Sequence, residues 1–170
     1  MRRLQLLIAL VLLTPAVVVG QPRLMLGGGV STPNGDVTEV AGTGFHAQAG
    51  LFVAIPTLPV GLRAEGVYHR LGAAGAAFDR TGILGGNLSM VFTLPGVGLS
   101  PYFFGGLGSY RTELGAIGVT ETVTDTGYHG GFGVNVGNGG LGGFAEIRYL
   151  QISGDARTIR LIPLTLGFRL

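Results

Sequence analysis

The chain ends on the stretch Ile162-Pro163-Leu164-Thr165-Leu166-Gly167-Phe168-Arg169-Leu170. Every second residue of this stretch is apolar, namely Ile162, Leu164, Leu166, Phe168 and Leu170. Successive side chains of a strand point to opposite faces, so all five lie on one face. A strand that closes a barrel in a lipid bilayer has such a face, because its outer side meets hydrocarbon. The stretch therefore predicts a closing strand of that kind.

The alternation of apolar and polar residues continues upstream of this stretch. Eight candidate strands lie at about residues 23–31, 44–55, 60–71, 82–93, 99–111, 127–137, 142–152 and 159–170. Most contain about 9–13 residues, which is longer than the usual strand of a soluble sheet and long enough to cross a bilayer at a tilt. We predict an all-β fold, an eight-stranded antiparallel up-and-down transmembrane β-barrel.

The connections between these strands alternate in length. The short ones are rich in Pro and Gly and lie at 56–59, 95–98 and 137–140. The long ones carry most of the charge and lie at 32–43, 72–81, 112–126 and 153–158. Outer-membrane barrels show this asymmetry, with short periplasmic turns and longer outer loops. An even number of strands then places both termini on the short-turn side.

The first residues indicate export. Met1-Arg2-Arg3 precedes an apolar run at residues 4–13, and small residues follow at Ala16 and Gly20. This pattern is typical of a secretory signal peptide, and the run is too short for a transmembrane helix. We predict residues 1–20 as a cleaved signal peptide and 21–170 as the barrel, with cleavage after Ala16 as the alternative. A retained N-terminal membrane anchor is the competing interpretation.

The composition excludes several classes of function. All 11 basic residues are Arg, two of them lie in the predicted signal peptide, and nine acidic residues balance the rest. Because no basic block exists, nucleic-acid binding has no electrostatic basis. The absence of Cys excludes disulfides and a lipoprotein anchor. The 33 Gly residues lie within alternating apolar segments, where they favour curvature and close backbone approach.

Charged residues recur on the predicted interior face of the strands. Arg63 and Glu65 are two apart in one strand, Glu146 and Arg148 are two apart in another, and Arg169 shares their parity in the last strand. Isolated charges in a narrow interior are costly, so we predict that these five residues form a network. The network either fills and plugs the barrel or acts as a gate. Eight strands leave room only for side chains, which favours the plug.

The inner and outer faces of the segment 99–111 cannot be assigned from the alternation of residues. It is apolar on both faces around Pro101-Tyr102-Phe103-Phe104, so the alternation does not orient it. If Tyr102 and Tyr110 point outward, they lie near opposite membrane interfaces.

Candidate catalytic residues are few. His46, His69 and His129 each lie near the loop end of a predicted strand, and Ser31 and Ser109 also lie near loop ends, so a Ser–His pair formed in space is possible. A serine hydrolase needs a nucleophile beside a base, yet no Ser adjoins a His in the sequence and no G-x-S-x-G motif occurs. The three His lack metal-ligand spacing. We therefore predict no catalytic residues, no metal and no cofactor.

A glycine-rich motif also has a simpler interpretation. Residues 137–142 match G-x-G-x-x-G, but a strand follows them where a nucleotide-binding motif needs a helix. We interpret this segment as a hairpin turn.

The predicted outer loops are the candidate surface for recognition. Their charged residues are Asp36, Glu39, Asp79, Arg80, Glu113, Glu121, Asp125, Asp155 and Arg157. Loops on a rigid scaffold often carry binding. A solvated rim facing lipopolysaccharide, without a dedicated partner, is the alternative.

Taken together, the mature chain resembles the small eight-stranded outer-membrane barrels, the OmpA-like and OmpX-like barrel family. The resemblance rests on the strand rhythm, on Pro101-Tyr102 leading into Gly105-Gly106-Leu107-Gly108, on Glu146-Ile147-Arg148-Tyr149, and on the terminal strand. It implies a monomer in the outer membrane of a Gram-negative bacterium, surrounded by outer-membrane lipids. It also implies that periplasmic chaperones and the barrel-assembly machinery handle the chain, and that the alternating C-terminal strand is the assembly signal. The family usually ends on Phe, whereas this chain ends on Leu170, with Phe168 two residues before it.

The expected function is non-enzymatic, a structural or surface-interaction role through the outer loops. Two alternatives stay open. One is a lipid-modifying barrel enzyme of the outer membrane. The other is a soluble periplasmic barrel that binds an apolar ligand inside, as lipocalins do, and this alternative requires the opposite orientation of the faces.

Overall fold

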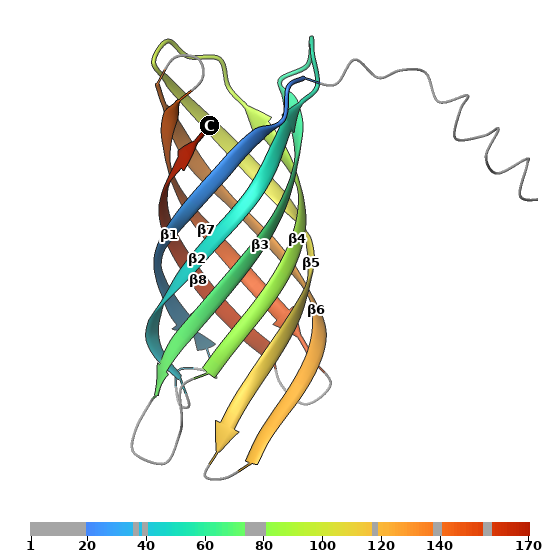
Figure 1. The fold of residues 1–170 in the computed structure, drawn as a ribbon, viewed down its shortest axis with the longest axis vertical. Coiled ribbons are helices and arrows are strands. Elements are labelled where there is room, and N and C mark those ends of the chain that lie inside the picture. Colours follow the sequence, from blue (N-terminus) through green and yellow to red (C-terminus); the bar gives the residue numbers. More distant parts are fainter. Residues whose placement is uncertain are drawn as a thin grey trace, which may run out of the picture.

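The computed structural model describes residues 20–35, 38, 41–73, 81–116, 119–137, 141–154 and 158–170, with only the backbone described at 114–116 and 119–121. The predicted signal peptide therefore lies almost wholly outside the described residues. The described chain forms a closed barrel of eight antiparallel strands in sequence order, in which β1 also pairs with β8 (Figure 1). The strands are β1 (Arg23–Asn34), β2 (Ala41–Ala54), β3 (Val60–Ala73), β4 (Thr81–Thr93), β5 (Leu99–Ala116), β6 (Val119–Val136), β7 (Gly142–Ser153) and β8 (Thr158–Arg169).

The predicted fold class is confirmed, but one predicted loop is wrong. The segment 112–126 was expected to be a long connection, whereas β5 and β6 stay paired up to Ala116 and Val119. The physical reason is local composition, because Thr120, Thr122, Val123 and Thr124 are β-branched and favour strands. The hairpin therefore extends the barrel wall beyond its neighbours (Figure 1).

The short connections and both ends of the described chain lie at one end of the barrel, here called the turn end (Figure 1). Leu24 and Leu170 exchange two backbone hydrogen bonds there, of 2.8 and 2.9 Å between N and O. The backbone N of Gly20 also donates to the carbonyl of Ala54, at 2.9 Å. The long connections belong to the opposite end, the loop end.

The outer face of the barrel is apolar, as the alternation predicted. Among the most exposed large side chains are Leu107 at 71%, Leu88 at 68% and Phe132 at 59%. The terminal strand conforms to this rule, since Leu164, Leu166, Phe168 and Leu170 are all exposed, with Ile162 partly buried. The exposure of so much apolar surface on every side is the reverse of a water-soluble barrel.

The structure orients the strand that its sequence left ambiguous. Tyr102 and Tyr110 point into the barrel and are 2% and 0% exposed, so the idea that they mark membrane interfaces is wrong. Interior glycines of neighbouring strands make room for these rings. A Cβ on Gly85 would overlap the Tyr110 ring, and one on Gly133 would lie 2.5 Å from Tyr102.

The interior is layered along the barrel axis. An apolar cluster at the loop end includes Leu71, Ile83, Tyr110, Ile152 and Leu161. A smaller cluster of Val91, Tyr102 and Phe104 lies toward the turn end. Polar and charged side chains occupy the space between them, and this middle layer contains the candidate site.

The described residues include no helix with the length and hydropathy that a membrane span requires.

Candidate functional site: the polar interior

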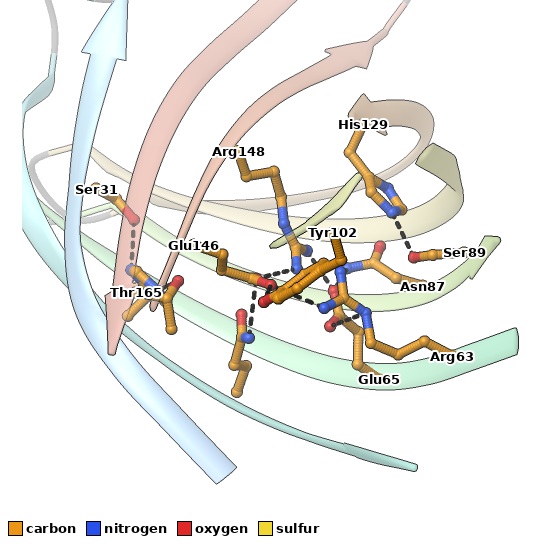
Figure 2. Close-up of polar contacts among 12 residues, drawn as sticks. Ser31, Arg63, Glu65, Asn87, Ser89, Tyr102, His129, Glu146, Arg148 and Thr165 are labelled. Atoms are coloured by element: carbon orange, nitrogen blue, oxygen red, sulfur yellow. Dashed lines mark hydrogen bonds and ion pairs between the residues drawn. The ribbon is translucent and has the colours of Figure 1, made fainter. Parts of the chain in front are cut away.

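Four buried charged residues meet at the centre of the barrel. Arg63 and Glu65 come from β3, and Glu146 and Arg148 come from β7, across the lumen (Figure 2). Their spacing of two residues places both members of each pair on the interior face. The barrel is narrow enough for side chains from opposite walls to touch.

These four side chains alternate in charge and form a closed ring of contacts. Arg63 Nη1 donates to Glu146 Oε2 at 2.8 Å, and Arg63 Nε lies 3.2 Å from Glu65 Oε2. Arg148 Nη2 donates to Glu146 Oε1 at 2.8 Å, and Arg148 Nη1 donates to Glu65 Oε1. All four side chains are at most 2% exposed. Two positive and two negative charges balance, so the ring is neutral as a whole.

Neutral side chains complete the environment of the carboxylates. Gln48 Nε2 donates to Glu146 Oε1 at 3.2 Å, and Tyr102 Oη donates to Glu146 Oε2 at 3.0 Å. Asn87 Nδ2 donates to Glu65 Oε1 at 3.2 Å. Each carboxylate thereby accepts from both charged and neutral donors, which offsets the cost of its burial.

An aromatic ring also contacts both cations of the charged ring. The guanidinium carbons of Arg63 and Arg148 lie 4.2 and 5.1 Å from the centre of the Phe104 ring. Both distances suit a cation–π interaction. Phe104 thus connects the charged ring to the apolar cluster at the turn end.

The fifth predicted member of the network is elsewhere. Arg169 forms no ion pair with either carboxylate among the described residues, and it lies at the turn end, where it lines a small cavity with Arg63 and Tyr102. The prediction that Arg169 joins the network is therefore wrong in its geometry. Its parity along β8 correctly predicted an interior side chain. Because Arg169 is the last residue of β8, however, that side chain lies at the turn end and does not reach the charged ring.

A second polar cluster, which the sequence offered only as an unspecified Ser–His pair in space, lies between β1, β2, β3 and β8. The Ser31 Oγ atom is 3.0 Å from His46 Nδ1 and 2.8 Å from His69 Nδ1. The His46 Nε2 atom is 2.9 Å from Thr165 Oγ1. Ser89 Oγ contacts His129 Nε2 separately, at 2.8 Å. The interior parity of Ser31 was the signal available in the sequence, whereas the direct pairing of His46 with His69 comes from the register of β2 and β3.

The Ser–His contacts do not form an accessible catalytic site. Ser31, His46 and His69 are 0%, 3% and 1% exposed, so a lipid substrate cannot reach the hydroxyl in this conformation. The second nitrogen of His69 has no hydrogen-bond partner in the part of the chain that the structure describes, whereas a catalytic base needs an orienting group there. Within the described part of the chain, no three potential ligands gather to hold a metal ion.

Most charged residues assigned to the outer loops lie outside the described residues, namely Asp36, Glu39, Asp79, Arg80, Asp155 and Arg157. The side chain of Glu121 is likewise not described. Glu113 belongs to β5 and lies 3.7 Å from Arg111 on the outer face. The predicted turn at 137–142 is described only at Gly137 and from Leu141 onward.

Solved structures of the same architecture are known. Neisserial surface protein A shares 14% sequence identity, with 89% of this chain and 97% of that one covered and a TM-score of 0.76. Ail, the attachment invasion locus protein of Yersinia pestis, shares 16%, with 89% and 99% covered and a TM-score of 0.56. A major outer membrane protein from Thermus thermophilus shares 12%, with 87% and 98% covered and a TM-score of 0.52.

These likenesses establish the fold. The chain has the fold of the small eight-stranded outer-membrane barrels. No protein-family model matches the sequence, and no curated protein matches it either.

Proposed function

We propose that this chain is a monomeric, non-enzymatic barrel of a bacterial outer membrane with a structural or surface-contact role. The proposal rests on the apolar outer face of a closed barrel in which every strand pairs with a neighbour on each side, except along the outer part of the β5–β6 hairpin. Closure satisfies the backbone groups that hydrocarbon cannot, and the apolar face matches the lipid. The similar structures include a surface protein and an outer membrane protein, which supports the same location.

The β5–β6 hairpin is the proposed contact surface. β4 pairs with β5 only as far as Glu113, and β7 pairs with β6 only from Thr126. Among the described residues, no strand pairs with the other edge of β6 at 119–125. Free backbone groups along a strand edge are a template for another extended chain, which supports a role in recognition.

The polarity of the interior argues against the soluble alternative. A barrel that stores an apolar ligand needs an apolar cavity, whereas this interior contains the charged ring and three Ser–His contacts. The lipid-modifying alternative lacks an accessible nucleophile among the buried Ser–His pairs. Comparison of lipid A from cells with and without the protein tests it, because an enzyme must change the acyl content.

Biogenesis follows from the proposed location. We propose that residues 1–20 are removed on export and that 21–170 form the mature barrel. Periplasmic chaperones and the assembly machinery would then receive it, with the apolar stripe that ends on Phe168 and Leu170 as the assembly signal.

The first experiment is gel mobility of the outer-membrane fraction, unheated against boiled in SDS. We expect the protein in that fraction, with a heat-dependent band shift, because a closed barrel resists SDS until it is boiled. A protein found in the periplasmic extract without a shift would contradict the proposal.

An epitope inserted between Ala116 and Val119 tests the orientation. We expect antibody to label intact cells that carry this insertion. The matched control is the same epitope in the short turn at 95–98, which should be labelled only after the cells are made permeable. Labelling of both in intact cells, or of neither, would contradict display of the hairpin at the surface.

A further inference from the structure

The turn end of the barrel opens into a cavity of about 360 Å³ whose polar lining consists of hydrogen-bond donors and neutral groups. Arg23, Arg169, Asn135, Thr93 and Ser100 line it, together with apolar residues of β2 and of the turn before β3. A smaller space of about 10 Å³, roughly one water in size, continues inward to Arg63 and Tyr102. Asn135 and Arg169 line both spaces, so they lie between the outer cavity and the inner one.

Several donors at this mouth have no partner. The Nε of Arg169 and the Nη2 of Arg63 are buried and make no hydrogen bond to any described residue. Asn135 is only 8% exposed, and its side-chain amide makes no hydrogen bond among the described residues. The inner space beside Arg63 holds roughly one water, which is enough to complete its Nη2, so the donors left for a larger ligand are those of the outer cavity, from Arg23, Arg169 and Asn135.

The two arginines of the turn end, Arg23 and Arg169, make no ion pair with any described residue. Glu65 and Glu146 are occupied by Arg63 and Arg148. The other acidic residues belong, in the sequence, to the long connections or the strand ends beside them: Asp36, Glu39, Asp79, Glu113, Glu121, Asp125 and Asp155. The mouth therefore combines two guanidinium groups with a lining that includes no acidic side chain among the described residues.

We propose that this mouth is a binding site for a small oxyanion, a phosphate or carboxylate group. Guanidinium groups match the planar donor geometry that such anions accept, and the Asn135 amide supplies a neutral donor at the inner end. The group comes either from a free solute or from the headgroup of a phospholipid at the rim. The site depends on the barrel geometry and is separate from the hairpin at the opposite end.

The test is a titration of the folded mature protein in a neutral maltoside detergent with inorganic phosphate at constant ionic strength. Nitrogen-15 NMR follows the guanidinium and side-chain amide signals. We expect saturable shifts at Arg23, Arg169 and Asn135, and none at Arg111, which lies exposed on the outer face near the loop end. Parallel titrations use acetate, or phosphatidylglycerol added to the micelles.

Two variants and a control locate the site. Arg169→Gln and Asn135→Leu should each weaken phosphate binding by about tenfold, since each removes one donor to the anion. Arg111→Gln is the matched control and should leave the affinity unchanged. The heat-dependent gel shift confirms that each variant is folded, and Asn135→Leu keeps every charge in place.

Each outcome decides the proposal. Saturation with phosphate or acetate supports the site and identifies a free solute as the source, whereas saturation with phosphatidylglycerol alone supports it with a headgroup as the source. Shifts that rise linearly, that appear equally at Arg111, or that survive both mouth variants would overturn it.

Discussion

At the residue scale, the interior depends on the balance of four charges. Glu146 accepts hydrogen bonds from Arg63, Arg148, Gln48 and Tyr102, so both of its oxygens are fully used. Because the side chain is buried, its removal leaves the two guanidinium groups without one of their counter-ions in a medium of low polarity.

We therefore predict that Glu146→Ala lowers the free energy of unfolding by about 3–5 kcal/mol, as expected for a broken buried ion pair. Urea unfolding in detergent micelles measures it. The control is Glu113→Ala, which breaks the exposed pair with Arg111 and should change stability by less than about 1 kcal/mol. Equal stability of Glu146→Ala and the original protein would disprove the stabilising role of the ring.

Two adjacent glycines form a second matched pair. A Cβ on Gly85 would overlap the buried Tyr110 ring, whereas a Cβ on Gly86 would meet nothing within 4 Å. We predict that Gly85→Ala destabilises the barrel by about 1–3 kcal/mol through overpacking, while Gly86→Ala does not. The same urea titration compares them, and similar effects of both substitutions would show that Tyr110 does not need the space.

At the element scale, β8 and the β5–β6 hairpin have different roles. β8 pairs with both β1 and β7, so it closes the wall, and its outer face is apolar. The outer part of the hairpin has pairing partners only within itself. Substitutions in β8 should therefore affect the barrel, and substitutions in the hairpin tip should not.

Leu164→Arg tests the lipid-facing role of β8. Leu164 is 50% exposed in the middle of the strand, and an Arg near the centre of a bilayer costs about 2–4 kcal/mol. We predict a loss of that size for the protein folded into lipid vesicles. Leu58→Arg, in an exposed turn, is the control and should have little effect. If Leu164→Arg left the stability unchanged, that result would favour a barrel surrounded by water.

Shortening the hairpin tests its independence from the barrel. Glu113 pairs with Thr122, so Asn-Gly in place of residues 114–121 makes a two-residue turn at the correct register. We predict that the gel shift on heating and the urea midpoint stay unchanged. A large loss of stability would show that the hairpin supports the wall instead of extending it.

At the scale of the whole molecule, the layers of the interior close the lumen. Apolar clusters lie on both sides of the charged ring, and the space on the turn-end side of Arg63 holds roughly one water. The arrangement favours the plug over the gate, because several interlocked contacts would have to break together to open a path.

We accordingly predict no steady ion conductance when the purified protein is inserted in a planar bilayer. Current recordings at moderate voltage measure it, and an established porin in the same membrane confirms that insertion and recording work. Regular unit steps of current from the purified barrel would support the gate.

The alternation of apolar and polar residues in the sequence predicts much of the barrel architecture. The period of two separates the inner from the outer residues of β2, β3, β4 and β8, because it depends only on strand geometry. Arg63, Glu65, Glu146 and Arg148 were assigned to the interior on that basis alone. The same rule failed to orient β5, where both faces are apolar, and it could not foresee that the hairpin extends through 112–126.

Parity tells which face a residue occupies but not its height in the barrel. Register and stagger between strands set that height. They bring Ser31 between His46 and His69, turn Tyr102 toward Glu146, and place Arg169 at the mouth instead of in the charged ring. The chain alone thus specified a closed barrel with an apolar wall, whereas contacts across the lumen emerged from the fold, because they join strands that are distant in sequence.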